Sequence, residues 1–223
     1  PTLLPTMPDH ADLTQPIEDG MQTYPGDPPV SLSDHTTHAA DGYHVESLSC
    51  GSHTGTHIDA PRHTEPDGNP LSAFSIDRFV FDAVRVDCQD CAAREAITPD
   101  RLPADDALAD ADMVVCWTGW DDHWNTDRYL DHPYVAPETA ARFADHGLAV
   151  GVDTLSPDPT PSERAGDDEP TDFAAHHALL GDDCLIVENL RNLGGVDDRF
   201  ELRAYPLALG GDGAPVRAVG VQQ

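Results

Sequence analysis

Short apolar runs recur along the chain and limit what it can fold into. "MVVCW" (113–117), "LAVGV" (148–152) and "CLIVE" (184–188) each suit one buried strand, and none approaches the length of a membrane-spanning helix. Segments with helical spacing or turn residues lie between these runs. The sequence therefore predicts an α/β fold with a mixed central sheet and flanking helices, in a single domain over residues 1–223.

The charge of the chain excludes some partners. It carries 41 acidic residues against 12 basic ones, a formal net charge of −29, and every basic residue is arginine. Such an excess repels nucleic acid and anionic membranes. The apolar runs argue against disorder, so the acidic residues indicate a folded protein whose surface suits a salty cytoplasm. We expect a cytoplasmic protein that loses its fold or activity in dilute buffer.

Hydrophobic periodicity and capping residues predict further helices and strands. A strand running into a histidine-rich segment is expected over 43–53, and a helix over 171–181 is expected to start at an N-cap Thr171 and to end at Gly181. The remaining expectations are a short helix after Thr98, a strand at 79–87, a helix over 136–147 and a hairpin built from 200–209 and 215–221.

The segment "SHTGTHIDAPRH" (52–63) concentrates chemistry. Gly55 and Pro61 disfavour a helix, so the chain is expected to be extended, and His53, His57 and Asp59 then point to one side. Imidazole and carboxylate together suit Zn²⁺, Mn²⁺ or Fe²⁺. Turn and surface histidines are the plain alternative, but this number of them around one aspartate favours a metal site.

A second group of candidate ligands lies near the C-terminus. Asp59 could bridge to an ion held by His176 on a helix and Glu188 at the end of a strand. The residues alone do not separate His176 from His177. His63, which follows a proline and is turned aside from the ligand row, suits a general acid or base.

The motif resembles that of a known family. "HTGTHIDAPRH" fills every fixed position of H-x-G-T-H-x-D-x-P-x-H, the hallmark of the metal-dependent cyclase family, and within it the chain looks like the bacterial kynurenine formamidases (arylformamidases). "YPGDPP", "VGVDTLSPD", "HHALLGDDCLIVENL" and "YPLALGGDGAPVRAV" extend the resemblance over most of the chain. It implies a swivelling β/β/α domain that forms a homodimer or homotetramer.

The resemblance also implies roles for individual residues. The implied ligands of a first divalent ion are His53, His57 and Asp59, with Asp59 bridging to a second ion. Family spacing selects His176, with Glu188, for that second ion. His63 matches the catalytic histidine. Tyr24 stands where the formamidases usually carry a tryptophan that faces the substrate's ring, and tyrosine can also stack.

Three functions are consistent with this sequence. The first is a metal-dependent amidohydrolase that converts N-formylkynurenine to kynurenine and formate by metal-activated water, with two divalent ions, Zn²⁺ first and Mn²⁺ as the alternative. The second is a ring-opening hydrolase of a cyclic amide or imide such as isatin. The third is a metal-stabilised binding protein without turnover. A small-molecule substrate is expected for the first two.

Overall fold

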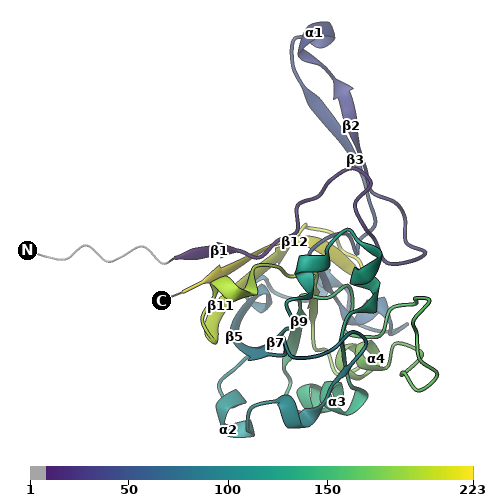
Figure 1. Ribbon diagram of the computed structural model, residues 1–223. Coiled ribbons are helices and arrows are strands. Elements are labelled where there is room, and N and C mark those ends of the chain that lie inside the picture. Colours follow the sequence, from purple (N-terminus) through teal and green to yellow (C-terminus); the bar gives the residue numbers. More distant parts are fainter. Residues whose placement is uncertain (1–8, 223) are drawn as a thin grey trace, which may run out of the picture.

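One mixed sheet organises the protein. The structure, a computed structural model, describes residues 9–222, and its strands follow the order β1-β12-β11-β5-β7-β9-β10-β4 (Figure 1). Since β4 also pairs with β12, the sheet closes into a barrel. The predicted mixed sheet is therefore confirmed. The strands are β1 (His10–Asp12), β4 (His57–Asp59), β5 (Val80–Asp87), β7 (Met113–Trp117), β9 (Ala149–Val152), β10 (Ile186–Glu188), β11 (Arg199–Pro206) and β12 (Gly213–Val221).

The apolar runs form the parallel part of the barrel. Strands β5, β7, β9 and β10 pair in parallel, and β4, β11 and β12 complete the ring with antiparallel pairings. Along β7, Met113 and Val115 belong to one core cluster, and Val114 and Cys116 belong to another. Both faces of β7, β9 and β10 are buried, which explains why these three strands read as continuous apolar runs rather than as alternating patterns.

Two helices cover one side of the barrel and contact each other. Helix α3 (Pro137–Asp145) starts with a proline in its first turn, and Gly147 just after it has a φ of 67°, as predicted for its end. Helix α4 (Ala174–Leu180) ends before Gly181 as expected, but its N-cap is Phe173 and not Thr171. The predicted cap is wrong because the chain turns through left-handed backbone at 172 and 173 before the helix starts.

Smaller elements complete the chain. Thr98 precedes a 3-10 turn (Pro99–Arg101) where a short helix was predicted. Single helical turns, α1 and α2, and a two-stranded pair lie between the larger elements: α1 (His38–Asp41), α2 (Asp105–Leu108), β6 (Ala96–Ile97) and β8 (Tyr134–Val135). The predicted hairpin near the C-terminus is confirmed as β11 and β12. Within 9–222, no helix has the length and apolar character to cross a membrane.

A second hairpin stands away from the barrel. Among the described strands, β2 (Ser31–Thr36) and β3 (Val45–Ser49) pair only with each other, and they project from the body as an arm (Figure 1). The strand predicted over 43–53 thus ends at Ser49, and the histidine-rich segment begins in a separate turn. This part of the prediction is wrong, because alternation alone cannot show where a strand leaves the body of the protein.

Candidate metal centre

The closure of the barrel brings the first ligand candidates together. Strands β4 and β10 run antiparallel with His57 opposite Glu188. The Nε2 atom of His57 lies 3.2 Å from Glu188 Oε2 and 3.3 Å from Asp59 Oδ1. All three side chains are almost fully buried. Paired strands therefore fix two carboxylates and an imidazole around a common point.

A helix and a turn supply the other two imidazoles. From α4, His176 Nε2 lies 3.2 Å from Glu188 Oε1 and 3.7 Å from Asp59 Oδ2. His53 Nδ1 lies 2.7 Å from Asp59 Oδ1. His53 reaches this position from the turn before β4, because β4 covers only residues 57–59. The expectation that a single extended strand carries the whole ligand row is therefore wrong, although the residues do converge.

The five candidates form two groups that share Asp59. In each group, His53–His57–Asp59 and Asp59–His176–Glu188, the potential ligand atoms lie within 4.8 Å of one another. His57 Nε2, Asp59 Oδ2 and Glu188 Oε1 are buried and have no hydrogen-bond partner among the described residues. Buried polar atoms without partners are costly. Their convergence, with imidazole and carboxylate donors together, fits divalent cations.

Each candidate imidazole is oriented by a hydrogen bond on its other ring nitrogen. His57 Nδ1 lies 2.8 Å from the Gly55 carbonyl oxygen, to which it can donate. His176 Nδ1 lies 2.7 Å from Asp158 Oδ2, and His53 Nε2 lies 2.9 Å from Asp212 Oδ2. Partners of this kind fix the ring and direct the remaining nitrogen at an ion.

Sequence reasoning missed both aspartates. Asp158 follows the apolar run of β9 in "DTLSPD", and its carboxylate also accepts hydrogen bonds from the backbone N–H groups of Ala175 and His176. Asp212 lies in the "GGDG" turn before β12. Gly213, the next residue, leaves room for the ring of His53, because a Cβ on Gly213 would lie 2.7 Å from His53 Cε1. An aspartate and a glycine in a turn are ordinary, so no local pattern indicated these roles.

The electrostatics of the cluster strongly favour a positive charge between its carboxylates. Burial alone would lower the pKa of His57, but the adjacent carboxylates of Asp59 and Glu188 outweigh burial and raise it well above its ordinary value. Burial likewise opposes ionisation of Asp59, yet the surrounding imidazoles hold its pKa well below its usual range. Two buried carboxylates thus favour the nearest available cation, and a divalent ion would satisfy both.

A pocket opens beside the cluster. His63, in the 3-10 turn Pro61–His63, lies on its wall with its ring centroid 3.9 Å from that of His53 and 5.5 Å from that of His176. Burial lowers the pKa of His63. Tyr24 also lines the pocket. His177 does not: its Nδ1 lies 2.6 Å from Glu65 on the exposed face of α4.

Comparison with known proteins identifies the family. The family model "Cyclase", described as "Putative cyclase", matches residues 11–159. The chain is 34% identical over 216 residues to "Kynurenine formamidase" of Salinibacter ruber, with 93% of this chain and 95% of that protein covered. It is 34% identical over 212 residues to "Kynurenine formamidase" of Bacillus mycoides, with the same coverage. The protein therefore belongs to the cyclase family.

Solved structures share the fold. Isatin hydrolase A from Ralstonia solanacearum superimposes with a TM-score of 0.82 at 23% identity, over 97% of this chain and 92% of that one. A structure described as a "potential metal-dependent hydrolase with cyclase activity" superimposes with a TM-score of 0.75 at 26% identity, over 97% of this chain and 99% of that one. The barrel is thus the fold of cyclase-family hydrolases.

Proposed function

We propose that this protein is a metal-dependent amidohydrolase that cleaves the N-formyl amide of N-formylkynurenine to kynurenine and formate. One observation carries the proposal: a turn histidine, a helix histidine and two strand residues converge on Asp59, and the strand residues, Asp59 included, have buried polar atoms that lack partners among the described residues. The relatives named kynurenine formamidase, which match nearly the whole chain, support the choice of substrate.

The cluster would hold two divalent ions. His53, His57 and Asp59 are assigned to one, and Asp59, His176 and Glu188 to the other. We propose Zn²⁺ as the resident ion, with Mn²⁺ as the alternative, since both accept this donor set. When bound, such ions polarise an amide carbonyl and make water nucleophilic near neutral pH.

The remaining roles fall to side chains of the pocket. His63 stands beside the cluster, and burial lowers its pKa, which favours the neutral imidazole that can accept a proton. It would pass that proton to the aryl amine nitrogen as the C–N bond breaks, leaving formate and the free amine. Tyr24 would lie against the aromatic ring.

The direct test is hydrolysis of N-formylkynurenine by the purified protein in molar potassium chloride, with Zn²⁺ or Mn²⁺ supplied. Release of kynurenine is the expected result. Isatin serves as the second substrate, because the fold neighbours include isatin hydrolases. Turnover of isatin with no release of kynurenine would replace the formamidase by a ring-opening hydrolase. Turnover of neither, with ions tightly bound, would favour the non-catalytic binding protein.

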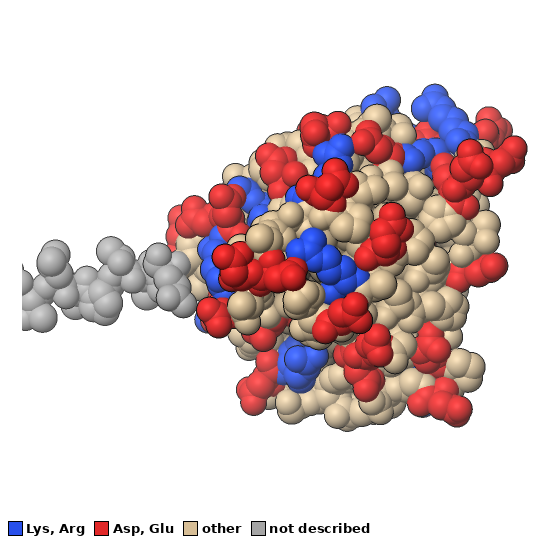
Figure 2. Space-filling view, turned by 90° about the horizontal axis from the view of Figure 1, so that it is seen from below, with Lys and Arg blue, Asp and Glu red and all other residues tan. Residues whose placement is uncertain are grey.

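We further propose that the protein works in the cytoplasm at high salt. Acidic side chains are spread over the face seen in Figure 2 and outnumber the basic ones there, in line with the net charge of −29. Their mutual repulsion is screened by salt. The midpoint of thermal unfolding should therefore rise steeply between 0.1 M and 2 M potassium chloride, and a flat response would contradict salt adaptation.

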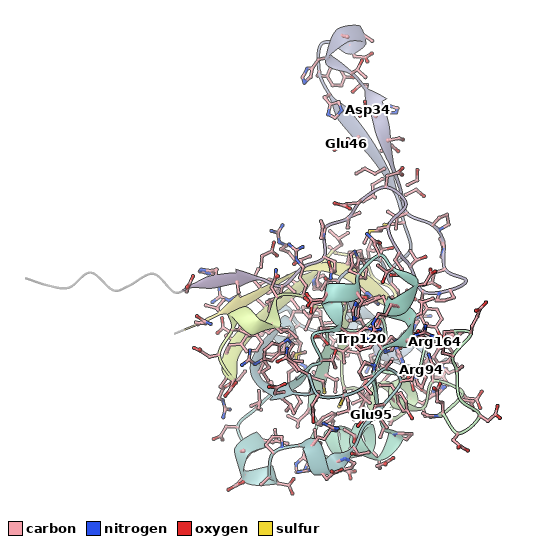
Figure 3. All side chains as sticks on the ribbon, viewed as in Figure 1. Asp34, Glu46, Arg94, Glu95, Trp120 and Arg164 are labelled. Atoms are coloured by element: carbon pink, nitrogen blue, oxygen red, sulfur yellow. The ribbon has the colours of Figure 1, made fainter. Side chains whose placement is uncertain are left out.

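We propose a homo-oligomer, a dimer or a tetramer, as the working form. The projecting arm leaves Tyr43, Val45 and Leu48 exposed, and Asp34 and Glu46 are carried on it far from the barrel (Figure 3). A two-stranded hairpin is marginally stable in water by itself, so contact with a second copy would stabilise it. Sedimentation in molar salt measures the state directly, and a monomer would contradict this assignment.

A further inference from the structure

The chain adopts an unfavourable backbone conformation immediately before α4. Asp172 and Phe173 both have positive φ, 61° and 55°, although neither is glycine. For a bulky residue such as phenylalanine the left-handed region is a genuine outlier. Strain of this kind persists only where the surrounding structure enforces it, and it concentrates at functional sites.

The loop before the strained pair is fixed by Arg94. Its guanidinium pairs with the carboxylate of Glu169 and donates to the Thr160 carbonyl at 3.0 Å and to Ser162 Oγ at 3.2 Å. The Arg94 side chain is almost fully buried. Figure 3 shows Arg94 and Arg164 close together, on the side of the barrel where this loop runs. The loop from 156 to 170 is thus attached to the body.

The helix after the strained pair is fixed as well. Asp158 accepts hydrogen bonds from the N–H of Ala175 at 2.8 Å and of His176 at 3.0 Å, which sets the first turn of α4. Asp172 and Phe173 therefore connect two immobilised segments. The conformational strain is confined to the two residues that join them.

This conformation places an aromatic ring in the pocket. Phe173 is 46% exposed, unusual for a phenylalanine, and it lines the pocket beside the metal cluster. Its ring centroid lies 6.0 Å from that of His176 in an edge-on arrangement, and 6.3 Å from that of Tyr24. Both separations suit aromatic pairs. Phe173 and Tyr24 thus present two aromatic surfaces next to the candidate ligand His176.

We propose that Phe173 is a specificity-determining residue, which together with Tyr24 binds the aromatic ring of the substrate's amine portion. The inference rests on the proposed function and deepens it by assigning a second side chain, from the segment before α4, to the ring of the substrate. The strained backbone at 172–173 is retained because it turns the Phe173 ring toward the pocket.

Replacing Phe173 with glycine separates strain from binding. Glycine adopts positive φ freely, so Phe173→Gly should leave the thermal midpoint in molar salt unchanged or higher. Binding of 2-aminoacetophenone, an aromatic amine with the ring of the product, should weaken about tenfold, as expected for loss of one aromatic contact. Inhibition by formate, which carries no ring, should not change. The KM for N-formylkynurenine should rise as the binding of 2-aminoacetophenone weakens.

Two further variants make the test decisive. Phe173→Tyr keeps the ring and should restore binding of 2-aminoacetophenone to near the wild-type value. Asp172→Gly adds the same backbone freedom but keeps the ring, so its binding should match the wild type. Unchanged binding in Phe173→Gly, or equal weakening in Asp172→Gly, would overturn the inference. Binding of 2-aminoacetophenone is measured without turnover, so failure of the wild type to release kynurenine would reject the proposed function and leave this test intact.

Discussion

The two sides of the site differ in how they are built. On the inner side, Asp59, Glu188 and His176 are at most 5% exposed and belong to paired strands or to a helix. On the outer side, the His63 side chain is 33% exposed, and Tyr24 lies in a turn-rich loop. The inner residues are held rigidly enough to bind ions, and the outer ones are accessible enough to meet substrate. The division suggests that ion binding and proton transfer can be disrupted separately.

The largest effect is expected at the centre of the inner side. Asp59→Asn keeps the shape of the side chain but removes the charge that both ligand groups share. We expect loss of bound metal and a fall of activity by at least about three orders of magnitude, because metal chemistry supplies several kcal/mol of the rate enhancement. Metal content by elemental analysis and hydrolysis of N-formylkynurenine measure the two effects.

The matched control is Asp67→Asn, an exposed aspartate in the turn that follows His63. It should retain both metal and rate. If Asp59→Asn also kept its full metal content, Asp59 would not be the shared ligand, and the two-ion assignment would have to be abandoned.

A smaller loss of activity, without loss of metal, is expected on the outer side of the site. His63→Ala should keep the metal content of the wild type and lower kcat by about 10²–10⁴-fold, the usual contribution of general acid–base catalysis. His177→Ala is the control, since His177 lies on the same helix as His176 but pairs with Glu65 at the surface. Joint loss of metal and rate in His63→Ala would place His63 among the ligands.

A smaller effect is expected from the residue that orients His176. Asp158→Asn weakens the acceptor of His176 Nδ1 without touching an ion, so metal affinity should fall by about 10–100-fold. Competition with a chelator gives the dissociation constant. The exposed loop residue Asp167 provides the control variant Asp167→Asn. An Asp158→Asn protein with wild-type affinity would show that the backbone alone positions His176.

The sequence allowed more of the inner side to be predicted than of its supports. The apolar runs located β7, β9 and β10 because strands buried on both faces carry a continuous signal. The motif located His53, His57 and Asp59, but their convergence with His176 and Glu188 depends on β4 closing the barrel. No local pattern encodes that pairing between distant segments. The residues alone therefore left His176 and His177 as alternatives, and the choice of His176 relied on the family resemblance.

The supports escaped prediction for a related reason. Asp158, Asp212 and Gly213 are residues of ordinary turns, and only their positions in space relate them to the histidines. Phe173 was missed because its left-handed backbone arises from anchors on both sides, at Glu169 and at Ala175. A phenylalanine just before a helix is expected to be buried in the core. At Phe173 the tertiary contacts on both sides override that preference.

His132 is a buried histidine outside the candidate metal centre. His132 is buried between neutral partners: its Nδ1 lies 2.7 Å from the Pro133 carbonyl oxygen and its Nε2 lies 2.7 Å from Thr160 Oγ1. Burial lowers the pKa of His132 from 6.5 to about 4. The cluster histidines, by contrast, face carboxylates, which raise the pKa of His57 and of His176.

This contrast predicts an acid sensitivity that does not arise at the metal centre. As the pH falls from 6.5 toward 4, the unfolded chain takes up a proton at His132 that the folded protein does not accept. Folding stability should therefore fall by up to about 3 kcal/mol over that window, and remain unaffected by His132 above it. In His132→Gln, which cannot be protonated, this contribution should be absent. Denaturant unfolding at pH 7 and pH 4.5 in molar salt, compared between the two proteins, isolates it because the other titrating groups are common to both. An equal pH dependence in His132→Gln would contradict this assignment and show that the acid sensitivity comes from other titrating groups.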